Sequence, residues 1–141
     1  MRKYLFIFIL LFVFAAAEVS AARIDTVAVF SAKMRRDIPA LVVVPDGGVG
    51  RRMPVLYLLH GFGGSYTTWQ NITDLRPLAD ACGMIVVCPD GANSWYWDSP
   101  LDPASQFETF VAQELPDWID ARYLTIPSRE GRAVTGLSMG G

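Results

Sequence analysis

RAVTGLSMGG, residues 132–141, is the stretch of this 141-residue chain that decides its fold. A short strand pattern at 132–136 leads directly into GLSMG at 136–140, which has the form G-x-S-x-G. In this pattern the serine sits on a strained strand-to-helix turn, and the glycines avoid clashes that larger residues would make with the neighbouring strand and helix. The stretch therefore predicts a strand that ends in a sharp turn and lifts the Ser138 hydroxyl clear of the sheet.

A second glycine-rich segment, GFGG, lies in the loop that would complete a catalytic site around such a serine. Residues 55–60 (VLYLLH) form a continuous apolar run, typical of a strand buried on both faces of a parallel sheet, and GFGG follows at 61–64. An oxyanion hole on this turn uses the N–H of the residue after the serine and an N–H from the loop after the third strand. We therefore predict that Ser138 is a catalytic nucleophile and that the N–H groups of Phe62 and Met139 form its oxyanion hole. The alternative is that both glycine clusters are ordinary turns.

Strand and helix patterns alternate along the rest of the chain. Strand patterns occur at residues 24–30, 39–45, 55–60, 84–88 and 132–136. Apolar residues recur at helical spacing over 75–82, with Thr73 or Asp74 as the expected cap and Gly83 as the stop. Two strands followed by strand–helix units predict an α/β protein with a mostly parallel sheet and flanking helices.

A longer helical pattern spans residues 105–124 (SQFETFVAQELPDWIDARYL). Its large apolar residues lie on one helical stripe: Phe107, Phe110, Val111, Leu115, Trp118, Ile119 and Tyr123. Pro116 lies inside this pattern. Because proline has no N–H and crowds the preceding turn, we expect it to kink the helix or divide it in two.

The loop NSWYWDSP, residues 93–100, places three aromatic residues after the strand at 84–88. We predict that Trp95, Tyr96 and Trp97 bind substrate, by stacking on a sugar ring or on an aromatic acyl group. The alternative is that they pack over the helix that follows. Trp69 is expected to lie in the core.

Four segments in order carry a resemblance to a known family: PVLYLLHGFGGSYTTW (54–69), VVCPDGANSWYWDSP (86–100), ELPDWIDARY (114–123) and AVTGLSMGG (133–141). They resemble the putative-esterase (esterase D-like) family of α/β-hydrolases, which includes S-formylglutathione hydrolases, feruloyl and acetyl-xylan esterases and mycolyltransferases. The resemblance implies an α/β-hydrolase fold and carboxylic-ester hydrolysis. It implies Ser138 as nucleophile, Phe62 as loop donor, and no metal or organic cofactor.

The chain departs from this family in one respect. An α/β-hydrolase triad runs in the order Ser, Asp or Glu, His, but the only histidine is His60, which precedes the serine and is expected to brace the oxyanion loop. Asp90 and Asp98 also precede it, and we interpret them as turn or cap residues. A serine without a base is a weak nucleophile at neutral pH. We therefore predict an esterase domain truncated after the elbow strand and inactive as this fragment.

Two other functions fit the same residues. An acyltransferase of the mycolyltransferase type would form the same acyl-enzyme and pass the acyl group to a sugar or lipid hydroxyl. A non-catalytic secreted module would instead bind glycans through Trp95, Tyr96 and Trp97. For the enzyme, the expected partner is a small-molecule or polysaccharide ester. The sequence predicts neither the acyl and alcohol groups nor an oligomeric state.

The N-terminus has the three-part form of a secretory signal peptide. MRK is followed by the apolar run YLFIFILLFVFAAA at 4–17 and by small residues up to Ala22. The run is shorter than the roughly 20 residues that span a bilayer as a helix, which favours cleavage over a retained membrane anchor. We therefore expect a signal peptide at 1–22, a domain at 23–141, and export to the periplasm or the cell exterior.

Charge and cysteine content narrow the partners and the covalent structure. The chain has 12 Lys and Arg against 14 Asp and Glu without a run of like charge, which argues against a nucleic-acid partner. Its two cysteines, Cys82 and Cys88, are separated by the end of a helix and an extended strand. The Cα atoms of these two cysteines are therefore expected to lie farther apart than the roughly 4.4–6.8 Å that a disulfide needs, so two buried free thiols are predicted.

Overall fold

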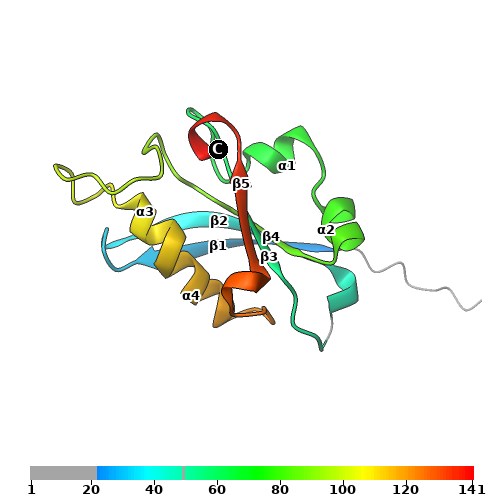
Figure 1. The fold of residues 1–141 in the computed structure, drawn as a ribbon. Helices are drawn as coiled ribbons and strands as arrows, with labels where there is room; N and C mark the ends of the chain where they lie inside the picture. Colours follow the sequence, from blue (N-terminus) through cyan, green and yellow to red (C-terminus); the bar gives the residue numbers. More distant parts are fainter. Residues whose placement is uncertain (1–21, 49) are drawn as a thin grey trace, which may run out of the picture.

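The computed structural model describes residues 22–48 and 50–141, so the predicted signal peptide lies outside the described residues except for Ala22. A five-stranded sheet forms the centre of the described chain (Figure 1). The strands are β1 (Arg23–Ser31), β2 (Arg36–Val44), β3 (Val55–Leu59), β4 (Ile85–Pro89) and β5 (Arg132–Gly136). Within the described ranges, no helix is both long and apolar enough to cross a membrane.

The sheet has the strand order β1-β2-β4-β3-β5 and is mixed. The pairings β1–β2 and β2–β4 are antiparallel, and β3–β4 and β3–β5 are parallel. A tight hairpin at 31–36 makes the first pair antiparallel, whereas helical crossovers join the parallel strands. All five predicted strands are present. The second one begins at Arg36 because its pairing with β1 continues past Pro39, which lies opposite Ala28.

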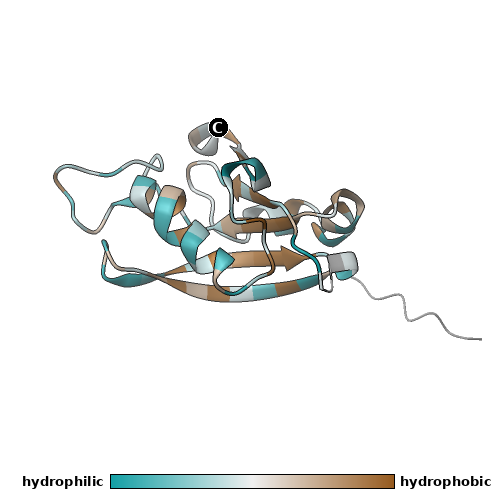
Figure 2. Ribbon diagram, turned by 60° about the horizontal axis from the view of Figure 1, so that its bottom comes forward, coloured by the Kyte–Doolittle hydropathy of each residue, from teal (hydrophilic) through white to brown (hydrophobic). Residues whose placement is uncertain are grey.

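Side chains of the central strands alternate between two cores, one on each face of the sheet. All five residues of β4 are buried. Ile85 and Val87 belong to the first core, and Val86 and Cys88 belong to the second. This alternation confirms that the continuous apolar run is a strand covered on both faces. Figure 2 shows the hydrophobic colouring of the central strands.

A divided helical segment covers the first core. It consists of α3 (Phe107–Thr109), a π-helical turn at Phe110–Glu114 and α4 (Leu115–Asp120). In the π turn the N–H of Leu115 bonds to the carbonyl of Phe110, immediately before Pro116. The wider turn accommodates a proline that has no N–H and would crowd a regular helix, so the helix is divided as predicted. The predicted stripe packs on this core: Phe107, Phe110, Val111, Leu115, Trp118, Ile119 and Tyr123.

Two short helices, α1 (Thr68–Ile72) and α2 (Arg76–Cys82), lie between β3 and β4. Gly83 ends α2 in the left-handed conformation at φ 62°, which confirms it as the stop. The cap position itself is Leu75, which has no capping side chain. Asp74, one residue earlier, accepts a hydrogen bond from the Arg76 N–H at 3.1 Å.

The second core contains Leu75 and Ala79, and Trp69 packs against it half-buried.

Cys88 is buried as predicted, but Cys82 is exposed, so the expectation of two buried thiols is wrong for Cys82. The short helix turns only one side toward the sheet, and its last residue lies beyond that contact. Both cysteines are free, as predicted.

Three short 3-10 turns complete the described chain: η1 (Asp46–Gly48), η3 (Arg129–Gly131) and η4 (Ser138–Gly140). Within the described residues, β5 pairs with β3 along one edge only. Val134 on β5 and Leu137 after it are exposed. The turn that carries Ser138 therefore lies at the end of an outer strand of the sheet.

Candidate active site

Ser138 follows β5 on a sharp turn and is exposed. Its φ of 56° lies in the left-handed region, which is unfavourable for a residue with a Cβ. A Cβ on Gly136 would lie 2.5 Å from the Leu59 carbonyl oxygen and would also overlap the carbonyl oxygen of Gly140. A Cβ on Gly140 would lie 2.7 Å from the Leu59 Cβ. The G-x-S-x-G pattern thus forms the predicted turn, and its glycines are sterically required.

The glycine-rich loop after β3 lies against this turn. A Cβ on Gly61 would be 3.2 Å from the Leu137 carbonyl oxygen and 3.5 Å from the Ser138 Cβ. Phe62 follows Gly61 directly, and Met139 follows the serine. In the part of the chain that the structure describes, the backbone N–H groups of Phe62 and Met139 donate no hydrogen bond to another residue. Two such N–H groups beside a serine are what an oxyanion hole requires.

His60 is buried at the start of this loop and braces it, as predicted. Its Nε2 atom accepts a hydrogen bond from the Gly91 N–H at 2.9 Å. The ring proton is therefore on Nδ1, which donates to the Gly61 carbonyl oxygen at 2.7 Å. With both ring nitrogens engaged by the backbone, His60 has no free nitrogen to take the proton of Ser138.

The three aromatic residues of the 93–100 loop lie in different environments. Trp95 and Trp97 are exposed, at 63% and 54% of their surface. The Trp95 ring lies 6.3 Å from the ring of Phe62, which is itself exposed. Tyr96 instead points inward, and its hydroxyl bonds to the backbone of His60. The two tryptophans remain available to a ligand, whereas the polar end of Tyr96 is occupied.

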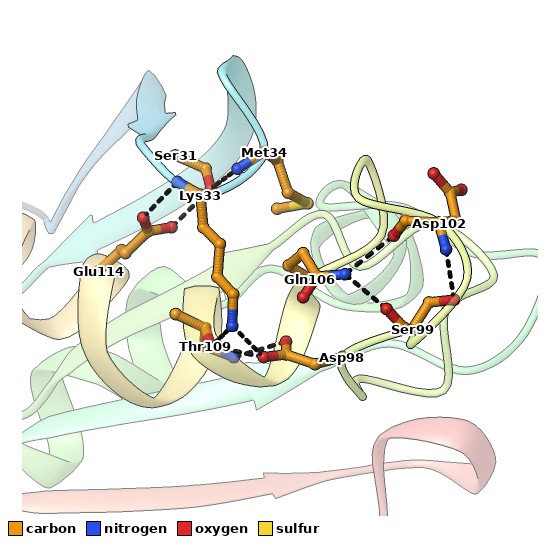
Figure 3. Close-up of polar contacts among 9 residues, drawn as sticks. All are labelled: Ser31, Lys33, Met34, Asp98, Ser99, Asp102, Gln106, Thr109 and Glu114. Carbon is orange, nitrogen blue, oxygen red and sulfur yellow. Dashed lines mark hydrogen bonds and ion pairs between the residues drawn. The ribbon is translucent and has the colours of Figure 1, made fainter.

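Asp98 is engaged in structural contacts, as a turn or cap residue would be (Figure 3). It accepts hydrogen bonds from the Thr109 N–H at 3.0 Å and hydroxyl at 2.5 Å, and pairs with Lys33 at 2.7 Å. Desolvation raises the pKa of Asp98, but the bonds from Lys33 and Thr109 outweigh it and lower the pKa to about 2. Asp90 is also a turn residue, and its side chain accepts the Ala92 N–H at 2.8 Å.

Asn93 is a residue of this region that the sequence did not single out. Its Oδ1 atom accepts a hydrogen bond from the Gly63 N–H at 2.7 Å, across 30 positions of sequence. No local pattern signals such a contact, because it depends on β3 and β4 ending side by side.

A pocket of about 360 Å³ adjoins Asn93, with Arg36, Asp102 and Phe107 in its lining. The Arg36 guanidinium lies 5.5 Å from the centre of the Phe107 ring. Among the described residues, no group of three or more His, Cys, Asp or Glu side chains is placed to hold a metal ion.

The mixed sheet with helices on both faces and the serine turn at the end of β5 define the α/β-hydrolase class of protein. Residues 31–141 match the family described as "Putative esterase", and the chain belongs to this family. The description of this family names it as one of esterases.

Similar proteins agree with this assignment. Esterase Rv1288 of Mycobacterium tuberculosis is 36% identical over 107 residues, which cover 71% of this chain and 23% of that protein. A solved ferulic acid esterase is 30% identical with a TM-score of 0.73, over 84% of this chain and 49% of that one. An S-formylglutathione hydrolase from Agrobacterium tumefaciens shares the fold, with a TM-score of 0.77 and 23% identity, over 87% of this chain and 53% of that one. The chain thus spans about half of each solved relative and less than a quarter of Esterase Rv1288.

Proposed function

We propose that this chain is the N-terminal part of an exported serine esterase in which Ser138 is the nucleophile. The observation that carries the proposal is the placement of Ser138: an exposed hydroxyl on a left-handed turn at the end of β5, with the Gly61 loop packed against it. A serine on such a turn can approach an ester carbonyl without hindrance from its own backbone. Family membership supports ester hydrolysis as the chemistry.

The proposed reaction proceeds through an acyl-enzyme. The Ser138 Oγ attacks the ester carbonyl carbon while a general base takes its proton, and the carbonyl oxygen becomes an oxyanion that accepts hydrogen bonds from the N–H groups of Phe62 and Met139. Collapse of this intermediate breaks the ester C–O bond, and the leaving oxygen takes the proton back from the base to depart as the alcohol. Water, deprotonated by the same base, then hydrolyses the acyl-serine and restores the Ser138 hydroxyl. One donor of this kind contributes roughly 10²–10³ in kcat.

A general base for Ser138 is also part of the proposal. The only histidine among the 141 residues is His60, and both of its ring nitrogens are bonded to the loop backbone. We therefore expect the catalytic His and its carboxylate partner to come from residues beyond these 141, and the 141-residue chain alone to be inactive.

The substrate that we propose is an ester of a plant-type polysaccharide or of an aromatic acid. Phe62 is exposed on the loop that follows β3, and Trp95 and Trp97 are exposed on the loop that follows β4. Aromatic faces of this kind stack on sugar rings and aromatic acyl groups. The 30% identity with a ferulic acid esterase supports this substrate class. Tyr96 is not included, because its hydroxyl is bonded to His60.

The test begins by reading the coding DNA past codon 141 and expressing the whole encoded protein beside its Ser138→Ala variant. Both are assayed on p-nitrophenyl esters and on acetylated and feruloylated xylan. We expect the wild type to hydrolyse these esters and the Ser138→Ala variant to do so at a rate at least 10³-fold lower. Hydrolysis that survives this substitution would refute the proposal.

The same experiment separates the alternatives. Product partition with an added alcohol or sugar acceptor reports acyl transfer. Saccharide binding that survives Ser138→Ala and is lost in Trp95→Ala, with no hydrolysis in the wild type, would favour a glycan-binding module. N-terminal sequencing of protein recovered outside the cytoplasm tests export and cleavage near Ala22.

A further inference from the structure

We infer that Tyr96 is a positioning residue for the oxyanion loop. Together with Asn93, it holds residues 60–64 so that the Phe62 N–H faces the ester carbonyl at Ser138. The inference rests on the proposed function, and it assigns to Tyr96 a role other than the substrate contact expected from the sequence.

The Tyr96 hydroxyl makes two hydrogen bonds to one residue of the loop. It accepts from the His60 N–H at 3.1 Å and donates to the His60 carbonyl oxygen at 3.3 Å. The hydroxyl therefore binds both backbone polar groups of the residue directly before Gly61. Burial raises the pKa of the Tyr96 hydroxyl, so it keeps the proton that the second bond requires.

The Tyr96 ring is fixed as firmly as its hydroxyl. It packs so closely on Gly91 that any Cβ at that position would overlap the ring. The ring also meets the His60 imidazole edge-on, with centroids 5.8 Å apart. A side chain held at its ring and at its oxygen can define the position of a backbone segment.

Asn93 holds the other end of the loop. Its Oδ1 atom accepts the Gly63 N–H at 2.7 Å, and the Gly64 N–H bonds to the Gly61 carbonyl oxygen at 3.0 Å. The N–H groups of residues 60, 63 and 64 are therefore engaged. That of Phe62, between the two anchored points, donates to no residue in the described chain.

The loop that carries Tyr96 and Asn93 adopts a backbone that its own residues do not favour. Ala92, Trp95 and Tyr96 have φ values of 47°, 57° and 52°, in the left-handed region. Such conformations persist only where the surrounding contacts impose them. Two sets of contacts hold this backbone: hydrogen bonds within the loop, such as those of the Ser94 hydroxyl with Gly91 and Tyr96, and the bonds of Tyr96 and Asn93 to residues 60–64.

A loop that positions an oxyanion donor has a specific kinetic signature. A displaced N–H stabilises the charged transition state less, whereas the uncharged ester in the ground state loses little. A displacement of about 1 Å can lower the rate by roughly 10²-fold. Loss of the tether should therefore lower kcat and leave KM unchanged.

The experiment uses the whole encoded protein with Tyr96→Phe, which removes the hydroxyl and keeps the ring. The matched control is Tyr123→Phe, which removes a hydroxyl that donates to Asp25 at 3.2 Å in another part of the fold. We expect a fall of about 10- to 100-fold in kcat for Tyr96→Phe, a KM within twofold of wild type, and weaker binding of a boronic acid transition-state analogue by the same factor as kcat/KM. Asn93→Ala, at an exposed position, should likewise lower kcat and leave KM close to that of the wild type.

Two kinetic results would overturn the inference: an unchanged kcat in Tyr96→Phe, or a raised KM at constant kcat, which would indicate substrate contact. If the wild type shows no Ser138-dependent hydrolysis, the proposed function is refuted, and kinetics cannot test the tether. Amide hydrogen exchange at Phe62 to Gly64 then tests the tether without any activity. Exchange at least tenfold faster in Tyr96→Phe than in Tyr123→Phe supports the tether, and equal rates refute it.

Discussion

The Nε2 atom of His60 accepts a hydrogen bond from the Gly91 N–H at 2.9 Å, which joins the loop after β3 to the loop after β4. The two strands are parallel neighbours, so their carboxyl ends, and the loops that follow, meet at one edge of the sheet. The bond fixes the ring proton on Nδ1 and directs it to the Gly61 carbonyl oxygen. The single histidine of the chain thus shapes the loop beside Ser138, and both of its ring nitrogens are engaged by the backbone.

Gly140→Ala should destabilise the protein through the elbow turn. The added Cβ would lie 2.7 Å from the Leu59 Cβ and 2.8 Å from the Leu59 carbonyl oxygen, so strand or turn must shift. We expect the free energy of unfolding to fall by about 1–3 kcal/mol, measured by urea denaturation. The control is Gly47→Ala, where nothing lies within 4 Å of the added Cβ. Equal stability of the two variants would contradict the tight turn.

Glu114→Ala should loosen the hairpin between β1 and β2. The Glu114 carboxylate accepts hydrogen bonds from the buried Ser31 hydroxyl at 2.6 Å and from the Lys33 N–H at 3.0 Å (Figure 3). Its loss leaves the Ser31 hydroxyl without an acceptor, which should lower the free energy of unfolding by about 1–3 kcal/mol. Glu108→Ala, at an exposed position of the adjacent α3, is the control and should change stability by less than about 0.5 kcal/mol. Similar losses in both would indicate that the Glu114 contacts contribute nothing specific.

Asp98→Asn should reduce stability in a pH-dependent way. The folded state lowers the pKa of Asp98 from its ordinary 3.8 to about 2, so the charged carboxylate stabilises the fold above about pH 4. That contribution declines as the pH falls from about 4 toward 2. Urea midpoints of wild type and Asp98→Asn should therefore differ most at pH 6 and converge near pH 2. A difference that stays constant or grows at low pH would rule out this account.

The two thiols should differ in reactivity in the native protein. Cys82 is exposed at the end of α2, whereas burial of Cys88 in the second core raises the pKa of its thiol to about 12. Titration with a disulfide reagent at pH 8 should modify Cys82 within minutes and Cys88 only after unfolding. Cys82→Ser should abolish the fast phase. A fast phase that persists in this variant would show that Cys88 is accessible.

Much of the fold follows from local pattern. Strand patterns, alternating at 24–30 and continuously apolar at 55–60 and 84–88, predicted the strands, and the stripe from Phe107 to Tyr123 predicted the helical segment over the first core. The glycines of 136–140 and 61–64 predicted the turn and the loop at the site. These features depend on sterics and periodicity within a few residues, so the sequence alone was sufficient to determine them.

Other features depend on residues that are distant in sequence. Only the folded structure placed Cys82 outside the core, turned the Tyr96 hydroxyl toward His60 and brought the Asn93 side chain to Gly63. The exposure of Cys82 depends on which side of α2 faces the sheet, and the contacts of Tyr96 and Asn93 depend on which strands are neighbours; no local pattern encodes either. The sequence therefore determined the elements and the turn that carries Ser138. The tertiary structure decided which side chains hold the glycine-rich loop at 60–64, because those contacts exist only when β3 and β4 lie side by side.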